Sequence, residues 1–269
     1  MQLCLRYGSF YQSERHDKRR YVIGRGSDRA FAMTFTPVLL PGNMCDSRLW
    51  TNQVRMVLPG AIDADLTRDE TISAMAASTL ASIEGELLVV GFSMGAIVAV
   101  EMWCQAPARI AGLVLLGYNA TADLPERAAH RPVQQVEVRA GGLERVLVEE
   151  LKPNYLGSAN RTDAALLALL RDMGMTLGTD VFLRQSEALR LREDRRDALG
   201  TITVPVLLGC GAEDMLCPPA WHANWATRIA GAENFTVDGA GPMLPLEAPR
   251  LLATTIDQWI NNNREKFEL

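Results

Sequence analysis

The pentapeptide GFSMG at residues 91–95 combines a nucleophilic side chain with two glycines. An apolar run typical of a buried strand, residues 87–90, leads into it, and a helix-like run, residues 96–101, leaves it. In such a turn the glycines let strand and helix approach closely, and the serine hydroxyl is exposed at the amino end of the helix. The sequence therefore predicts that Ser93 is a nucleophile; the alternative is an idle serine in a glycine-rich turn.

Strand-like and helix-like segments alternate on both sides of this turn. The predicted strands are residues 36–40, 60–66, 86–91, 110–116, 204–209 and 234–237. The predicted helices are residues 71–83, with Thr71 as a cap, 96–105, 219–229 and 249–260. Parallel strands need crossover connections, so this order predicts an α/β fold whose mainly parallel sheet is covered by helices on both faces.

Two segments depart from this alternation. Residues 119–200 are rich in helix signals, over 142–151, 162–175 and 181–192, without a convincing strand. We expect them to form a helical cap over the carboxyl ends of the strands, where open α/β sheets bind ligands. The predicted core is then 33–118 with 201–269.

Residues 1–32 are the second departure, because they carry a charged run at 15–20 and no sustained apolar period. A weakly ordered, solvated leader is one interpretation. The other is that Met33 is the natural start of the protein. A transit peptide is disfavoured by the acidic residues and the poor periodicity.

Composition limits the classes of partner. The chain has 269 residues, 48% of them hydrophobic, a formal net charge of −5 and a sequence pI near 5.4. This balance argues against a nucleic-acid surface, and the longest apolar stretch, residues 87–103, contains glycines and Glu101 and is better explained as strand–turn–helix than as a membrane span. Five cysteines without a C-x-x-C pair favour a reducing cytoplasm. No motif for a metal or nucleotide is present, so no cofactor is expected, and the oligomeric state is not indicated.

Several stretches resemble short bacterial α/β-hydrolases of the esterase/lactonase kind. They are LLPGNMCDSRLW at 39–50, the turn and helix at 91–101, and the segments 184–196, 204–218 and 245–249 (PLEAP). The resemblance extends over about residues 33–260. It implies an α/β-hydrolase fold with a cap insertion and a serine hydrolase that acts on a small carboxylic ester, thioester or lactone.

The resemblance also implies roles for single residues. Ser93 corresponds to the nucleophile, and the backbone N–H groups of Asn43 and Met94 correspond to the oxyanion hole. Asp214, on the loop after the strand at 204–209, corresponds to the triad acid; an ordinary loop or capping aspartate is the alternative. The neighbouring Glu213 is a less suitable acid.

The chain departs from the pattern at one position, because Pro242 stands where the resemblance places the catalytic histidine. The chain has three histidines, His16 in the leader, His130 in the cap and His222 on the helix at 219–229. His222 is expected to be a surface or half-buried helix residue, with service as a substitute base as the alternative. A serine without an adjacent base is a poor nucleophile, so turnover should fall by about 10⁴–10⁶.

Two classes of function therefore stay open. The first is a hydrolase whose architecture is intact except at Pro242, and the second is a non-catalytic protein that binds or senses a small molecule under the cap. Intact glycines around Ser93 and an intact Asp214 favour the first, since a long-abandoned site should have changed at more than one position. Cofactor-free oxygen chemistry on the same fold would still need a base near Ser93.

Overall fold

A six-stranded parallel sheet forms the centre of the molecule, with strand order β4-β3-β5-β6-β7-β8. The structure is a computed structural model, and it describes residues 21–23, 31–33, 35–151 and 155–267. The strands are β3 (Thr36–Leu40), β4 (Ile62–Asp63), β5 (Leu87–Phe92), β6 (Ile110–Leu116), β7 (Val206–Gly211) and β8 (Glu233–Val237). The predicted α/β class and parallel sheet are confirmed.

Helices cover both faces of this sheet because its central strands are apolar on both sides. Leu87 and Val89 of β5 belong to one hydrophobic cluster, and Leu88 and Val90 belong to the other. The first cluster includes residues of α2 (Ile72–Ser82), α3 (Met94–Gln105) and α7 (Pro219–Thr227). The second includes residues of α1 (Asn52–Val57), α8 (Leu244–Glu247) and α9 (Pro249–Asn262). Short 3₁₀ turns lie between these elements at Ser47–Leu49, Pro107–Arg109 and Ala198–Thr201.

Most predicted elements agree with the structure to within two residues, and the exceptions are at the surface. Thr71 caps α2 as predicted, since its hydroxyl accepts a hydrogen bond from the N–H of Ala74 (3.0 Å). The strand predicted over 60–66 is too long, because β4 comprises only Ile62 and Asp63. This strand lies at the edge of the sheet with both side chains exposed, and its last residue, Asp63, forms an ion pair with Arg55 of α1 (2.8 Å).

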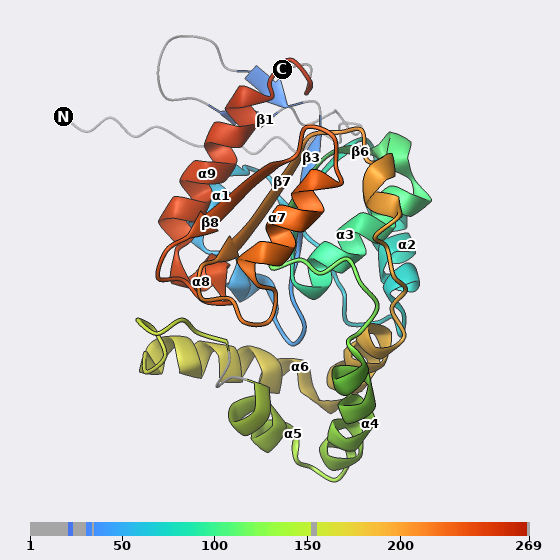
Figure 1. Cartoon of the computed structure of the whole chain (residues 1–269), viewed down its shortest axis with the longest axis vertical. Coiled ribbons are helices and arrows are strands. Elements are labelled where there is room, and N and C mark those ends of the chain that lie inside the picture. Colours follow the sequence, from blue (N-terminus) through green and yellow to red (C-terminus); the bar gives the residue numbers. More distant parts are fainter. Residues whose placement is uncertain (1–20, 24–30, 34, 152–154, 268–269) are drawn as a thin grey trace, which may run out of the picture.

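The insertion at 119–200 contains helices and no strand in the residues that the structure describes. These are α4 (Pro125–Arg139), α5 (Leu143–Arg145), a π-helical turn at Val146–Leu151, and α6 (Ala164–Arg190). The two helices predicted over 162–175 and 181–192 are joined as α6, which kinks at Gly178 (φ 80°). In Figure 1, α4, α5 and α6 lie together beyond one end of the sheet. Their apolar cluster includes Met44, which follows β3.

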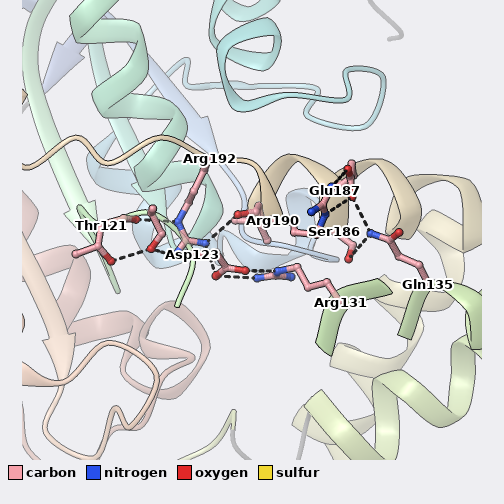
Figure 2. Close-up of polar contacts among 10 residues, drawn as sticks. Thr121, Asp123, Arg131, Gln135, Ser186, Glu187, Arg190 and Arg192 are labelled. Atoms are coloured by element: carbon pink, nitrogen blue, oxygen red, sulfur yellow. Dashed lines mark hydrogen bonds and ion pairs between the residues drawn. The ribbon is translucent and has the colours of Figure 1, made fainter. Parts of the chain in front are cut away.

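A buried ion-pair cluster connects the two ends of this insertion, where the chain leaves the core and returns to it (Figure 2). Asp123, on the chain leaving β6, accepts from Arg131 of α4 (2.6 Å) and from Arg192, which follows α6 (2.7 Å). Arg192 also donates to the carbonyl of Thr121 (3.0 Å). Because Asp123 and Arg192 are buried, removing one partner would leave the other charged and unpaired. The cluster therefore fixes the two connections between insertion and core against each other.

Little of the predicted leader is described. Residues Tyr21–Ile23 (β1) and Phe31–Met33 (β2) form an antiparallel pair. The charged run at 15–20 lies outside the described residues, so the interpretation of 1–32 stays a prediction. Within the described ranges, no helix is both long and apolar enough to span a bilayer.

Candidate active site

Ser93 occupies the turn between β5 and α3 with a backbone that non-glycine residues rarely adopt. Its φ is 52° and its ψ is −113°, and its N–H donates to the carbonyl of Leu116 on the neighbouring strand β6 (2.8 Å). A positive φ costs a serine free energy that the surrounding structure must offset. Met94 is the first residue of α3, where N–H groups have no partner within the helix. The turn therefore presents a hydroxyl and a backbone donor side by side.

Close packing of main chain on main chain holds this turn. A Cβ atom at Gly95 would lie 2.1 Å from the carbonyl oxygen of Leu40, at the end of β3. At Gly91 it would lie 2.5 Å from the carbonyl oxygen of Gly95. Both distances are far below contact distance, so β5, α3 and β3 can meet here only when these positions have no side chain. The two glycines of the pentapeptide are thus explained by geometry.

The turn after β3 lies beside Ser93. A Cβ atom at Gly42 would be 3.4 Å from Cβ of Ser93, and the next residue, Asn43, lines the same cavity as Ser93. Gln185 of α6 fixes this turn, because its Oε1 accepts from the N–H of Met44 (2.8 Å) and from Nδ2 of Asn43 (3.1 Å). Its Nε2 in turn donates to the carbonyl of Leu66 (3.1 Å). Gln185 lies in the family-like stretch 184–196, but its contacts could not be predicted from the local sequence.

Asp214 follows β7 and is nearly inaccessible, at 2% exposure. Its Oδ1 accepts from the N–H groups of Leu216 and Cys217 (both 2.8 Å). Burial raises the pKa of this carboxyl to about 6, against the lowering effect of these hydrogen bonds. Its other oxygen, Oδ2, faces Gly117 at the end of β6, 3.8 Å from where a Cβ would stand. Asp214 thus has one oxygen used for its own loop.

Glu213 points elsewhere. Its carboxylate accepts from the N–H (2.6 Å) and the hydroxyl (2.8 Å) of Ser158 in the insertion. Its partners lie outside the set of residues that line the cavity at Ser93. Asp214 therefore lines the cavity beside Ser93, whereas Glu213 does not.

One small cavity brings most of the predicted residues together. Its volume is about 50 Å³, several times the ~10–15 Å³ that a single water needs. Ser93, Asp214, Pro242 and Asn43 line it, whereas the side chain of Met94 is buried in the core. The other lining residues are Cys45, Phe92, Gly117, Tyr155, Leu216, Cys217 and Met243. We refer to this space as the Ser93 cavity.

Glu247, in the PLEAP stretch, holds the loop that carries Pro242. Its Oε1 accepts from the N–H groups of Gly241 (3.0 Å) and Met243 (3.1 Å). Its Oε2 accepts from the N–H of Gly157 (2.7 Å) and from Nδ2 of Asn160 (3.2 Å) in the insertion. The donors come from the residues on either side of position 242, so the loop does not need an N–H there. This arrangement explains how a proline, which lacks that donor, is accommodated.

His222 is fully buried, so the expectation of a surface or half-buried histidine is wrong. Its Nε2 accepts from the N–H of Tyr118 (2.9 Å), and its Nδ1 lies 3.3 Å from the carbonyl oxygen of Pro218. These partners require a neutral ring with the proton on Nδ1. Burial lowers its pKa to about 4. Both ring nitrogens are engaged, so His222 acts as a structural element that joins α7 to the end of β6.

The remaining histidines lie away from the cavity or outside the described part. His130 is exposed on α4 and faces Glu150 (3.2 Å), and His16 lies outside the described residues. Among the described residues, no histidine lines the Ser93 cavity. The structure thus brings Ser93, Asn43, Asp214 and Pro242 together without an imidazole between them.

Known proteins resemble this chain in sequence and fold. It is 27% identical over 188 residues to a pimeloyl-[acyl-carrier protein] methyl ester esterase of Neisseria meningitidis serogroup B, covering 68% of this chain and 72% of that protein. A thermophilic esterase from Thermogutta terrifontis superposes with a TM-score of 0.77 at 24% identity, covering 86% and 91% of the two chains. The enol-lactonase from Burkholderia xenovorans LB400 gives a TM-score of 0.71 at 20% identity, covering 84% and 92%.

The last two likenesses concern the fold alone. The sequence profile described as "Alpha/beta hydrolase family" matches residues 38–255, which span β3 to α9 and include the whole Ser93 cavity. The chain therefore belongs to the alpha/beta hydrolase family.

Proposed function

We propose that this chain is a serine hydrolase for a small carboxylic ester, thioester or lactone, and that Pro242 impairs it. The observation that carries the proposal is the Ser93 cavity, where a strained serine, a backbone turn with free donors and a buried carboxylate converge. The name of the relative in sequence, a pimeloyl-[acyl-carrier protein] methyl ester esterase, supports a carboxylic ester as the substrate.

Each residue has a distinct task in the proposed reaction. The Oγ of Ser93 attacks the carbonyl carbon, and the N–H groups of Asn43 and Met94 stabilise the oxyanion that forms. Asp214 is the group that would orient an imidazole and stabilise its charged form. The helical insertion acts as the cap, because Tyr155 lines the cavity and Gln185 holds the oxyanion turn.

The missing part is the base. Proline has no group that accepts the hydroxyl proton of Ser93, and the ring nitrogens of His222 are engaged elsewhere. Removal of a triad member typically leaves only ~10³–10⁴-fold catalysis over water. We therefore expect short esters to be hydrolysed barely above background.

Substitution of Pro242→His tests this proposal. We expect kcat/KM on a panel of short activated esters to rise by at least ~10³ relative to the unmodified chain. The loop should accept the histidine, because Glu247 binds the donors of Gly241 and Met243, and no bond depends on residue 242. Restored activity must disappear in the double variant with Ser93→Ala.

Two results would contradict the proposal. Activity that stays flat in Pro242→His, together with tight binding of a small molecule in the cavity, would favour a binding or sensing protein. High activity of the unmodified chain that persists in Ser93→Ala would mean that Ser93 is not the nucleophile. Folding of each variant is checked by circular dichroism before the comparison.

A further inference from the structure

The carboxylate of Asp214 has one oxygen engaged and one available. Both backbone donors reach Oδ1, and no hydrogen bond to Oδ2 occurs among the described residues. The residue is nevertheless buried and lines the Ser93 cavity. A buried carboxylate oxygen without a donor is costly, so this oxygen favours any ligand that brings an N–H group.

The same cavity presents a second polar group without a partner. The hydroxyl of Ser93 makes no hydrogen bond with the other described residues, although its backbone N–H does. Phe92 and Tyr155 contribute aromatic rings to the lining, which favours a flat and partly cationic ligand. The volume of about 50 Å³ suits a ring of a few heavy atoms.

We propose that the Ser93 cavity is a binding site for a small azole with an N–H and a bare nitrogen on opposite edges, and that the bound ring serves Ser93 as its base. The N–H donates to Oδ2 of Asp214, and the bare nitrogen faces the hydroxyl of Ser93. The base would thus come from a free ligand or from an azole group on the substrate. The binding step stands by itself, whereas the catalytic step rests on the proposed function.

The proton balance of this reaction is closed. The O–H bond of Ser93 breaks as its oxygen bonds to the ester carbonyl carbon, and the proton moves to the bare ring nitrogen. The ring returns this proton to the departing alcohol oxygen. Water then attacks the acyl-serine in the same way, releasing the acid and restoring both Ser93 and the neutral ring.

Binding is tested by titrating imidazole into the full chain and following it by calorimetry. We expect saturable binding in the millimolar range, weakened at least ~10-fold in Asp214→Asn. Pro242→His should also abolish it, because its own imidazole fills the space. As a ligand control that needs no substitution, 1-methylimidazole lacks the N–H and should bind at least ~10-fold more weakly. Equal binding of the two azoles, equal binding by Asp214→Asn, or no binding overturns the site.

Catalysis is tested with an unactivated alkyl ester, such as methyl butyrate, because free imidazole attacks activated aryl esters directly. We expect imidazole to raise hydrolysis by the unmodified chain at least ~10-fold, with saturation at the same concentration as binding. Ser93→Ala should still bind imidazole saturably through Asp214, although more weakly because the ring nitrogen loses the hydroxyl, and its hydrolysis rate should not rise with imidazole. Binding without any rate gain overturns the catalytic step alone, and if Pro242→His is also inactive, the proposed function fails with it.

Discussion

The two halves of the candidate site are held in place by different kinds of interaction. On the side of β3 and β5, the Ser93 turn is fixed by main chain packed on main chain, as at Gly95 against the carbonyl of Leu40. On the side of β7 and β8, side-chain carboxylates hold the loops, with Asp214 binding its own turn and Glu247 binding the loop at Pro242. Main chain is packed as closely on this second side, since a Cβ atom at Gly211 would lie 2.2 Å from the carbonyl oxygen of Ala240. What distinguishes the second side is therefore the carboxylates that hold its loops, and they bind no group of residue 242.

This difference explains how Pro242 is accommodated at the site. The N–H groups used by Glu247 belong to residues 241 and 243, so residue 242 contributes only its side chain to the site. A change at residue 242 alters a side chain that lines the cavity but leaves both hydrogen bonds to Glu247 in place. We therefore expect position 242 to tolerate substitution, whereas the glycines of the turn do not.

The largest loss of stability is expected from adding a methyl group to the turn on the side of β3 and β5. In Gly95→Ala, Cβ would stand 2.1 Å from the oxygen of Leu40, so strands and helix must separate. We expect the free energy of unfolding to fall by about 4 kcal/mol, measured by urea denaturation. Gly200→Ala is the control, because its nearest neighbour is 3.9 Å away, and its effect should stay within ~0.5 kcal/mol. Similar values for the two variants would show that close packing at Gly95 does not constrain the turn.

A smaller loss is expected from Glu247→Ala on the second side. The N–H of Gly241 and two donors in the insertion lose the acceptor that Glu247 provides, while the N–H of Met243 keeps the carbonyl of Tyr155 (3.1 Å), so we expect a loss of about 3 kcal/mol in urea denaturation. Combined with Pro242→His, it should also remove most of the restored activity. Glu213→Ala, which frees only Ser158, should cost less than ~1 kcal/mol. An equal loss of stability in the two variants would show that Glu247 stabilises its loop no more than Glu213 stabilises its own.

His222 gives a pH-dependent test near the second side. Its pKa in the fold is about 4, below the 6.5 of a free histidine, so the neutral form is favoured by folding. Its contribution is complete above pH 6.5 and is lost as the pH falls toward 4, by about 3 kcal/mol. His222→Gln keeps an acceptor for Tyr118 and should flatten this part of the stability–pH curve. Parallel curves for the two proteins would contradict the buried assignment.

Asp214 should act in the opposite direction with the smallest effect. Its pKa in the fold is about 6, above the 3.8 of a free aspartate, because burial disfavours the charged form, so the fold favours the protonated acid. Its contribution to stability is therefore lost as the pH rises through 6, with Arg127 opposing and Glu247 reinforcing the shift. Asp214→Asn should be about 1–2 kcal/mol more stable than the parent at pH 8 and equal to it below pH 4. A destabilised variant at pH 8 would contradict this assignment.

The parallel sheet, the turn at Ser93 and the approximate bounds of most helices could be predicted from the sequence alone. Apolar runs of five to seven residues and the glycines at 91 and 95 are local signals, and they agree with β5, β6 and α3 in the structure. Local signals overestimate the length of the edge strand β4, in which only two residues pair with β3. They also missed α4, whose surface is largely charged and polar.

The contacts that hold the loops of the site could be seen only in the tertiary structure. Gln185 reaches Asn43 across 142 residues of sequence, and Glu247 reaches Gly157 across 90. No periodicity records such contacts, because each depends on where the insertion lies against the sheet. The burial of His222 likewise follows from the packing of α7 against the end of β6, which places the N–H of Tyr118 within reach of Nε2. The carbonyl near Nδ1, that of Pro218, belongs to the start of the same helix.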